Sequence, residues 1–451
     1  AFEAYMRGRQ LSDTRITANL KLAIEDFREA TEIDPNFALA WVGLADAIAL
    51  DATYSGTPIE ESWAAREEAI QHALEIDPEL GEAWTSLGLL QHGKRELEAA
   101  EITFQKAIAL SPNYASAWHW YGNLMLNWNS RTQEQVDLLR KASELDPRSA
   151  IIGSSLAGAY WWIGSYARAE SQFEKTIELN PGFSQVQRHY GQYWSGAHGR
   201  MDKAIELMAG ALRLDPEAAW VKDRIILNLL ELEEFDLADQ FRMSIAESTP
   251  DSWRVGAFDI TIAGKRGNKE ALKEAWNWTK PRIQADTEWV FDAAIRNLLI
   301  NDDIASARQI INDAGDRWLN RENWSIRIEG HPSMACNVAW TLSQTGDQAL
   351  GAALLDQSLT FVEDLFGLIE HPGELGVEVC YLAAGETEKA LEVIETVFAH
   401  NHIFGWKDSS RLPLYEPIRF EPRYQEMNAE VELRLAEQRE AVKEMNLGAS
   451  L

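Results

Sequence analysis

Two pairs of residues have the types and spacing from which a reactive centre could be built. His331 precedes Cys336 in the segment GHPSMAC, and a histidine beside a cysteine can activate the thiol as a nucleophile. His400 and His402, in AHNHIF, could supply two metal ligands. Cys336, however, lies in an apolar helical pattern that predicts burial, and no carboxylate or cysteine near the two histidines completes a ligand set. We therefore expect an inert cysteine, histidines with a loop or helix-capping role, and no metal.

The remaining signatures of catalysis are missing from the sequence. Neither a P-loop nor a strand-bound G-x-G-x-x-G motif is present to hold a phosphate group. The two cysteines show no spacing typical of a metal knuckle or a disulfide framework, which fits a reducing cytoplasm. We expect a non-enzymatic segment without a cofactor, located in the cytoplasm.

The charge of the chain excludes other classes of partner. Its 71 acidic and 42 basic residues give a formal net charge of −29, which opposes binding to a phosphate backbone or to an anionic membrane. No uninterrupted apolar run approaches the roughly 18–20 residues that span a bilayer. We expect contact with neither nucleic acid nor membrane.

The elements that must position any functional residue are helical hairpins, and the clearest is 82–112. In its first helix Trp84 and Gly88 share one stripe, and in its second Ala100 and Phe104 share another. The two stripes must face each other, so we expect small Gly88 and Ala100 at the closest approach and bulky Trp84 and Phe104 in the gaps.

The signal that closes this hairpin recurs along the chain. Helical segments end at prolines 35, 78, 112, 147, 181, 216 and 250, and after the first interval these prolines are 34 or 35 residues apart. The first interval is longer because of an insertion at 51–61, which we expect to form a surface loop leading into a helix.

The order W-x2-L-G … A-x3-F … P in 82–112 closely resembles the tetratricopeptide repeat, whose period is about 34 residues. The resemblance implies an all-α superhelical solenoid of antiparallel helix pairs. We expect an array of about seven hairpins over 1–250, divergent hairpins over 251–403, and a Pro-containing loop followed by a C-terminal capping helix over 404–451.

A second resemblance involves the two ends of the chain. The segments 4–10, 21–47 and 412–427 resemble the tetratricopeptide regions that follow bacterial class III adenylate cyclase domains or winged-helix transcriptional regulator domains. In such proteins the catalytic or DNA-binding domain lies upstream. Because the chain begins without Met inside a helical pattern, we expect it to be part of a longer protein.

The first helices of a tetratricopeptide array line a concave groove, so the resemblance places ligand contacts beside the Trp/Leu/Gly stripe. Amides there could pair with a peptide main chain, aromatic rings could hold apolar side chains, and an arginine could take a carboxylate. Counting outward from the stripe gives His92, His119, Asn123, Asn127, Trp161, Trp162, Gln185, Arg188 and Gln192. The alternative is that they form solvated helix faces and inter-repeat packing.

We expect this segment to be a non-catalytic scaffold that binds a protein or peptide partner, as the sensor or interaction module of a larger bacterial signalling protein. Self-association is a further mode, because open solenoid ends expose apolar faces. One alternative is the regulatory region of a nucleotide cyclase or DNA-binding regulator, and another is a small-molecule sensor within 251–403. A clamp for a chaperone carboxylate is not expected, because the matching lysine positions hold Thr85 and His119.

Overall fold

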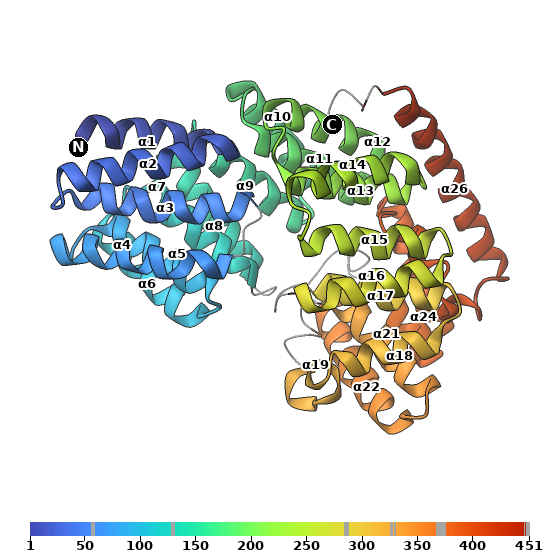
Figure 1. Cartoon of the computed structure of the whole chain (residues 1–451). Coiled ribbons are helices and arrows are strands. Elements are labelled where there is room, and N and C mark those ends of the chain that lie inside the picture. Colours follow the sequence, from blue (N-terminus) through green and yellow to red (C-terminus); the bar gives the residue numbers. More distant parts are fainter. Residues whose placement is uncertain are drawn as a thin grey trace. The chain divides into compact units, whose positions relative to one another are not determined.

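The computed structural model describes residues 1–55, 59–127, 131–283, 288–324, 328, 331–366, 376–445 and 447. The regular elements within these ranges are helices, which confirms the predicted all-α class (Figure 1). The chain divides into two compact units. The N-terminal unit is Ala1–Tyr193 with Glu206–Lys222, and the C-terminal unit is Trp194–Ile205 with Asp223–Ala449. The predicted bounds at 250 and 403 differ from this division and stay a prediction.

The N-terminal unit is a succession of paired helices that ends within α11, α12 and α13 (Figure 1). Its helices are α1 (Phe2–Thr14), α2 (Thr17–Ile33), α3 (Ala38–Ser55), η1 (Ile59–Ser62), α4 (Trp63–Ile76), α5 (Gly81–Gly93), α6 (Leu97–Leu110), α7 (Ala115–Leu124), η2 (Met125–Asn127), α8 (Thr132–Leu145), α9 (Ala150–Trp162) and α10 (Tyr166–Leu179). Helices α11 (Ser184–His198), α12 (Met201–Leu214) and α13 (Ala219–Glu231) are divided between the units: the end of α11, the start of α12 and most of α13 belong to the C-terminal unit.

The C-terminal unit continues the helical pairs and ends in a long helix. Its helices are α14 (Phe235–Ser248), α15 (Trp253–Lys265), α16 (Lys269–Thr279), η4 (Lys280–Arg282), α17 (Glu288–Ile300), α18 (Ile304–Asp313), α19 (Asp316–Leu319), η5 (Arg321–Asn323), α21 (Pro332–Gln344), α22 (Gln348–Phe366), α23 (Glu378–Ala384), α24 (Thr387–Ala399), α25 (Trp406–Ser409), η7 (Pro413–Tyr415) and α26 (Pro422–Lys443).

The hairpin formed by α5 and α6 shows why the repeat requires small residues. A Cβ atom added at Gly88 would lie 2.9 Å from Cδ1 of Phe104, which is fully buried. Gly8 and Gly43 meet the ring of Phe27 in the same way, at 3.0 and 2.3 Å. The glycine therefore lets the phenylalanine of the second helix pack directly against the backbone of a neighbouring helix.

The tryptophan of the repeat has a different role from the one predicted. Trp84 is only half-buried, with Nζ of Lys106 3.3 Å from the ring centroid. Its indole Nε1–H donates to the carbonyl oxygen of Pro78 at 2.9 Å, and Trp118 donates likewise to Pro112 at 2.9 Å. The side chain thus fastens each hairpin to the proline that ends the preceding helix and does not fill the centre of the hairpin.

The prolines end helices as predicted, through the residue that precedes each one. Asp34, Asp77 and Asp146 have φ near −137° and ψ between 83° and 95°, which is extended backbone. A residue before proline is excluded from the helical region by contact with the proline ring. The repeat period is therefore set by a local steric rule.

The predicted insertion at 51–61 differs from a surface loop over its first part. Helix α3 continues to Ser55, and Ala52 and Tyr54 are buried. The ring of Tyr54 lies 5.6 Å from that of Trp220 within the same unit, which explains why the helix extends. The expected helix start at Thr57 and Pro58 lies outside the described residues.

The C-terminal helix α26 has the predicted apolar face, because Tyr424, Val431, Leu435 and Val442 are buried. Its polar contacts fix its place in the C-terminal unit. The amide oxygen of Gln438 accepts from the backbone N–H of Met201 at 2.7 Å, and its Nε2 donates to the carbonyl of Gly199 at 2.8 Å. The helix thus caps the start of α12. That it also closes an open solenoid end stays a prediction.

The two cysteines form a disulfide, which contradicts the expectation of free thiols. Cys336 on α21 and Cys380 on α23 have Cα atoms 5.1 Å apart, and both residues are fully buried. The spacing of 44 residues gave no sign of the pair because the fold brings α21 and α23 together. The predicted cytoplasmic location stays a prediction. Among the described residues, none of the helices is long and apolar enough to cross a membrane.

Candidate functional site

The N-terminal unit contains a pocket of about 390 Å³ between the first helices of successive hairpins. Helices α7, α9 and α11 supply most of its wall, α3 adds two residues, and α5, α8, α10 and α13 add one each. The polar and aromatic residues that line it are Arg15, Thr53, Tyr54, His92, His119, Trp120, Asn123, Gln135, Ser154, Ser155, Trp161, Trp162, Phe173, Arg188, His189, Gln192 and Trp220.

Helical periodicity explains why these side chains meet. His119 and Asn123 are four residues apart on α7, as are Arg188 and Gln192 on α11, so each pair lies on one face. On α9, Gly158 leaves open space in the pocket, because a Cβ atom added there would have no neighbour within 4 Å. The absence of a side chain at Gly158 therefore contributes to the space in the pocket.

The structure brings most of the sequence-predicted groove residues together. The pocket is lined by His92, His119, Asn123, Trp161, Trp162, Arg188 and Gln192. Gln185 is completely buried beside it, where its Oε1 accepts a hydrogen bond from Nε of Arg188 at 3.1 Å. Asn127 ends η2, and its side chain lies outside the described residues.

His119 is a buried, neutral acceptor. Its Nε2 accepts from Nδ2 of Asn123 at 3.1 Å and lies 2.9 Å from Oγ of Ser155, so the proton is placed on Nδ1. Burial lowers the pKa of His119 to about 3, and nearby Arg15 adds to the shift. The residue holds the α7–α9 contact in place and does not carry charge at neutral pH.

His92 lies at another side of the pocket and is also neutral. Burial lowers the pKa of its imidazole to about 4, with a smaller contribution from the charge of Arg95. The pocket therefore presents imidazoles as hydrogen-bonding groups and not as cations.

Arg188, which the sequence predicts as a groove residue that could take a carboxylate, is engaged with protein groups in the structure. Its side chain is buried and its guanidinium carbon lies 3.5 Å from the centre of the Trp220 ring. Its Nη1 donates to Oε1 of Gln192 at 2.6 Å, and the guanidinium also contacts His189. Arg188 thus joins α11 to α13 as part of the wall of the pocket.

Three buried polar atoms in the pocket have no hydrogen-bond partner within the described part of the chain. They are Nε1 of Trp161, Nε1 of Trp220 and Oε1 of Gln135. The two indoles are donors and the amide oxygen is an acceptor. An unpaired buried polar atom costs free energy, so a ligand that offered both an acceptor and a donor would be favoured here.

The rim of the pocket is apolar and exposed. Trp162 is 48% exposed and Leu126 is 51% exposed. The rings of Trp161 and Trp162 stack with centroids 6.1 Å apart, and Trp161 also meets Tyr193 edge to face at 5.9 Å. The neighbouring tryptophans therefore face different surroundings, with Trp161 inside and Trp162 at the rim.

Several lining residues were not predicted from the sequence, and three of them, Gln135, Tyr54 and Trp220, show why. Gln135 lies on α8, the second helix of its hairpin, so the rule that first helices line the groove passes over it. Tyr54 lies in the apparent insertion, and Trp220 belongs to a later hairpin. No spacing in the sequence relates these three, because only the stacking of the hairpins brings them to one place.

The two residue pairs considered first do not form reactive centres in the structure. Cys336 is in the disulfide, and His331 precedes α21 in an exposed position. Nδ1 of His400 donates to the carbonyl of Thr396 at 2.8 Å, at the end of α24, and Nδ1 of His402 donates to that of Gly196 at 2.7 Å. The predicted capping role of His400 is confirmed. No group of three potential metal ligands occurs among the residues that the structure describes.

Comparisons with known proteins identify the class of the repeats. Family models described as tetratricopeptide repeat match residues 81–114 and 155–219. The chain therefore contains tetratricopeptide repeats, as predicted. Both matched segments belong wholly or mainly to the N-terminal unit, and they include helices α5, α9 and α11 of the pocket wall.

The curated relative found by sequence comparison shares low sequence identity with this chain. Anaphase-promoting complex subunit 3 of Schizosaccharomyces pombe is 24% identical over 153 residues, which cover 34% of this chain and 21% of that protein. The chain thus spans about a fifth of the length of this curated relative.

Solved structures with a similar fold include pilF of Pseudomonas aeruginosa and a tetratricopeptide repeat protein of Parabacteroides merdae. The first is 20% identical, with a TM-score of 0.35, and covers 49% of this chain and 96% of its own. The second is 13% identical, with a TM-score of 0.42, and covers 54% and 95%.

Proposed function

We propose that the pocket of the N-terminal unit binds an extended peptide segment of a protein partner. The observation that carries the proposal is the presence in one pocket of unpaired indole donors and an unpaired amide acceptor below an exposed aromatic rim. A peptide group carries one carbonyl acceptor and one N–H donor. The acceptor could pair with Nε1 of Trp161, and the donor could pair with Oε1 of Gln135.

The rim suggests the side chain that such a peptide would carry. Trp162 and Leu126 are large, apolar and about half exposed, and neutral His92 lies in the wall between the polar groups. An apolar or aromatic peptide side chain would bury surface against them at about 25 cal/mol per Å². Arg188 stacks on Trp220 and bonds Gln192, so we do not assign it the capture of a carboxylate. The chain acts in this proposal as a non-catalytic scaffold.

The experiment selects peptides from a displayed random library on the intact chain and measures a selected peptide by fluorescence anisotropy. Gly158→Leu should weaken binding by at least about tenfold, because the new side chain occupies the open space above α9. Gly182→Leu is the matched control: its Cβ also meets nothing within 4 Å, but it lies outside the pocket and should change nothing.

A second pair of variants tests the rim. Trp162→Ala should weaken binding by about tenfold, as expected for an aromatic anchor. Ile102→Ala removes an apolar side chain that is 68% exposed and lies outside the pocket, so it should leave affinity unchanged. Enrichment of no peptide, or equal binding by Gly158→Leu and the parent chain, would refute the proposal.

We further propose that the chain is the interaction module of a larger signalling protein. Support comes from its terminal segments 4–10 and 412–427, which resemble those of tetratricopeptide regions that follow cyclase or winged-helix domains. The sequence encoded upstream of Ala1 tests this: one of these domains is expected there, and an unrelated sequence would contradict it. The predicted self-association is tested separately by light scattering over a range of chain concentrations.

A further inference from the structure

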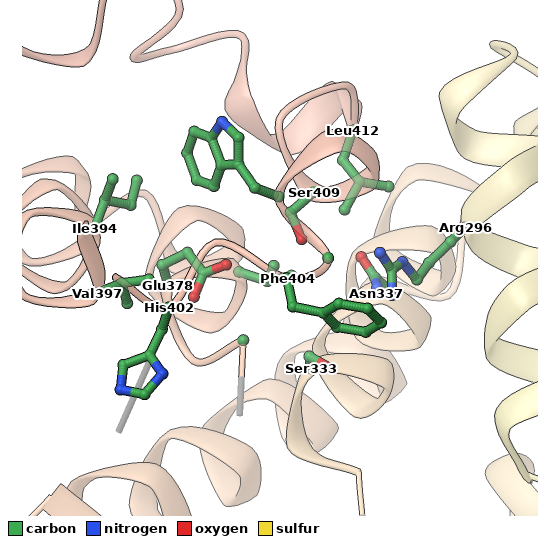
Figure 2. Close-up of a pocket in the computed structure, with 14 residues that line it drawn as sticks. Arg296, Ser333, Asn337, Glu378, Ile394, Val397, His402, Phe404, Ser409 and Leu412 are labelled. Atoms are coloured by element: carbon green, nitrogen blue, oxygen red, sulfur yellow. The ribbon is translucent and has the colours of Figure 1, made fainter. Parts of the chain in front are cut away.

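The C-terminal unit contains a second cavity, of about 230 Å³, that the proposed peptide site does not use. Figure 2 shows its lining side chains, which come from α17, α21, α23 and α24 and from the segment that leads into and through α25. For comparison, an engineered cavity of about 150 Å³ holds benzene, so this one has room for a ligand slightly larger than a single ring.

Two hydrogen-bond acceptors in this cavity lack a partner. Glu378 is 5% exposed; its Oε1 accepts from the hydroxyl of Tyr415 at 2.9 Å, but its Oε2 has no partner within the described ranges. Oδ1 of Asn337, which is 1% exposed, has none either within the same ranges. Both atoms belong to side chains that line the cavity, and both require a donor.

The cations nearest to the cavity are paired with other carboxylates. Arg296 lies 3.3 Å from Asp292 through Nη1 and 3.7 Å from Asp408 through Nη2. Lys265 pairs with the same Asp408 and lies 3.6 Å from Glu231. This group, defined here as the buried ion cluster, thus contains two cations and three carboxylates.

Glu378 adds a fourth carboxylate next to the buried ion cluster. Burial raises the pKa of the Glu378 carboxyl, and the hydrogen bond from Tyr415 and the charge of Arg296 offset only part of this shift. The direct ion pairs of Arg296 go to Asp292 and Asp408, so an added cation at Glu378 would favour its ionised form. A buried carboxylate oxygen that has neither a cation nor a donor of its own is costly. The cavity therefore favours a ligand that brings both positive charge and hydrogen-bond donors to Oε2.

The rest of the lining combines polar residues, Ser333, His402 and Ser409, with an apolar part. Val379, Ile394, Val397 and Leu412 supply aliphatic surface, and Trp406 is held in place by a 2.8 Å hydrogen bond from its Nε1 to Oδ1 of Asn428. Phe404 is 41% exposed, so it stands where the cavity meets solvent. A ligand with an aliphatic body would bury that body against these side chains.

We propose that this cavity binds a small primary amine whose aliphatic body carries a second, neutral hydrogen-bond donor. The ammonium group pairs with Oε2 of Glu378, and the second donor reaches Oδ1 of Asn337. The second donor is neutral because Arg296 also lines the cavity and would repel a second cation. An anion is excluded by the same acceptors that attract the ammonium group.

The experiment uses four linear four-carbon probes on the intact chain, measured by isothermal titration calorimetry at neutral pH. They are aminobutanol, butylamine, butanediol and hydroxybutyrate, each with its groups at the ends of the chain. We expect aminobutanol to bind best, butylamine to bind more weakly because it lacks the donor for Asn337, and the neutral and anionic probes not to bind. Equal binding by butanediol or hydroxybutyrate, or no binding of aminobutanol at millimolar concentration, would overturn the proposal.

Two variants locate the site. Glu378→Gln keeps an acceptor for Tyr415 but removes the charge, and should weaken aminobutanol binding by at least about tenfold. If that variant does not fold, Phe404→Ala serves instead, because its partly exposed ring can be removed with little loss of packing. Phe420→Ala is its control, since Phe420 is 81% exposed and lies outside the cavity. Unchanged binding in the folded Glu378→Gln protein, or equal effects of the two phenylalanine variants, would show that the amine binds elsewhere.

Discussion

The guanidinium carbon of Arg188 lies 3.5 Å from the centre of the Trp220 ring, so a side chain of α11 covers one of α13. Tyr54, from α3, packs on the same indole with ring centroids 5.6 Å apart. One stack in the wall of the peptide pocket therefore joins α3 to two later hairpins, which follow each other in sequence. The strength of that stack determines whether the pocket keeps its shape.

The first prediction follows from this stack. Arg188→Ala should lower the free energy of unfolding by about 2–4 kcal/mol, because it removes a desolvated cation–π contact and the hydrogen bonds that Arg188 donates to Gln185 and Gln192. Arg188→Lys should lose less, since it keeps the charge but not the planar fork. Urea unfolding followed by tryptophan fluorescence measures both. A loss below about 0.5 kcal/mol for Arg188→Ala would mean that the stack does not hold the pocket.

A second prediction concerns the contact of Gly88 with Phe104. Gly88→Leu should destabilise the chain by about 1–3 kcal/mol, because its Cβ would already lie 2.9 Å from the buried ring. Gly158→Leu places the same side chain on another first helix where nothing lies within 4 Å, and should cost little. Thermal unfolding by circular dichroism compares the two variants. Similar melting temperatures for both would argue against the close approach in the α5–α6 hairpin.

The buried histidines predict a particular dependence of stability on pH. Burial lowers the pKa of His92 to about 4 and that of His119 to about 3, while an unfolded chain titrates near pH 6.5. Below about pH 6.5 the unfolded chain binds protons that the folded chain does not, so stability present above that pH is lost as the pH falls. Each histidine contributes a slope of up to about 1.4 kcal/mol per pH unit, down to its folded pKa.

This dependence is tested by urea unfolding at several pH values between 7 and 4. His119→Gln should make the fall in stability shallower, because the variant has no imidazole to protonate in the unfolded state. His72→Gln, which changes an exposed histidine, is the control and should leave the slope as it is in the parent. Parallel curves for the parent and His119→Gln would contradict the neutral, buried assignment.

The disulfide gives a prediction for the C-terminal unit. Cys336 and Cys380 close a loop of 44 residues between α21 and α23, so reduction should lower the free energy of unfolding by about 2–4 kcal/mol. Thermal unfolding with and without dithiothreitol measures the effect. The Cys336→Ala, Cys380→Ala double variant is the control, because its melting temperature should not respond to the reductant. An equal response of parent and variant would show that the thiols are not paired.

Local rules explain how much of the fold could be predicted. Asp77 takes an extended conformation because Pro78 follows it, and Gly88 is small because Phe104 faces it; both effects act within one hairpin. At Trp84 the local pattern gave a wrong prediction, because its apolar ring suggested that it fills the gap at the centre of the hairpin. Its N–H instead bonds the carbonyl of Pro78, a contact that spacing alone does not reveal.

The candidate site was predictable to the extent that one helix face determines it. Trp162, His119 and Arg188 were found because they lie beside the repeat stripe on first helices. How exposed each of these side chains is could not be predicted from the sequence. Arg188, for example, is buried by Trp220, which comes from another hairpin. Gln135 was missed for the same reason, because a residue on a second helix reaches the pocket only through the stacking of the hairpins.

By itself, then, the sequence determined the helix class, the repeat period and the faces of the first helices, because steric limits before proline and helical periodicity act over a few residues. The tertiary structure alone decided that Cys336 meets Cys380, that Gln438 caps α12, and that Glu378 and Asn337 share a cavity. These contacts join residues 41 to 237 positions apart, and no local pattern fixes which hairpin faces will pack together.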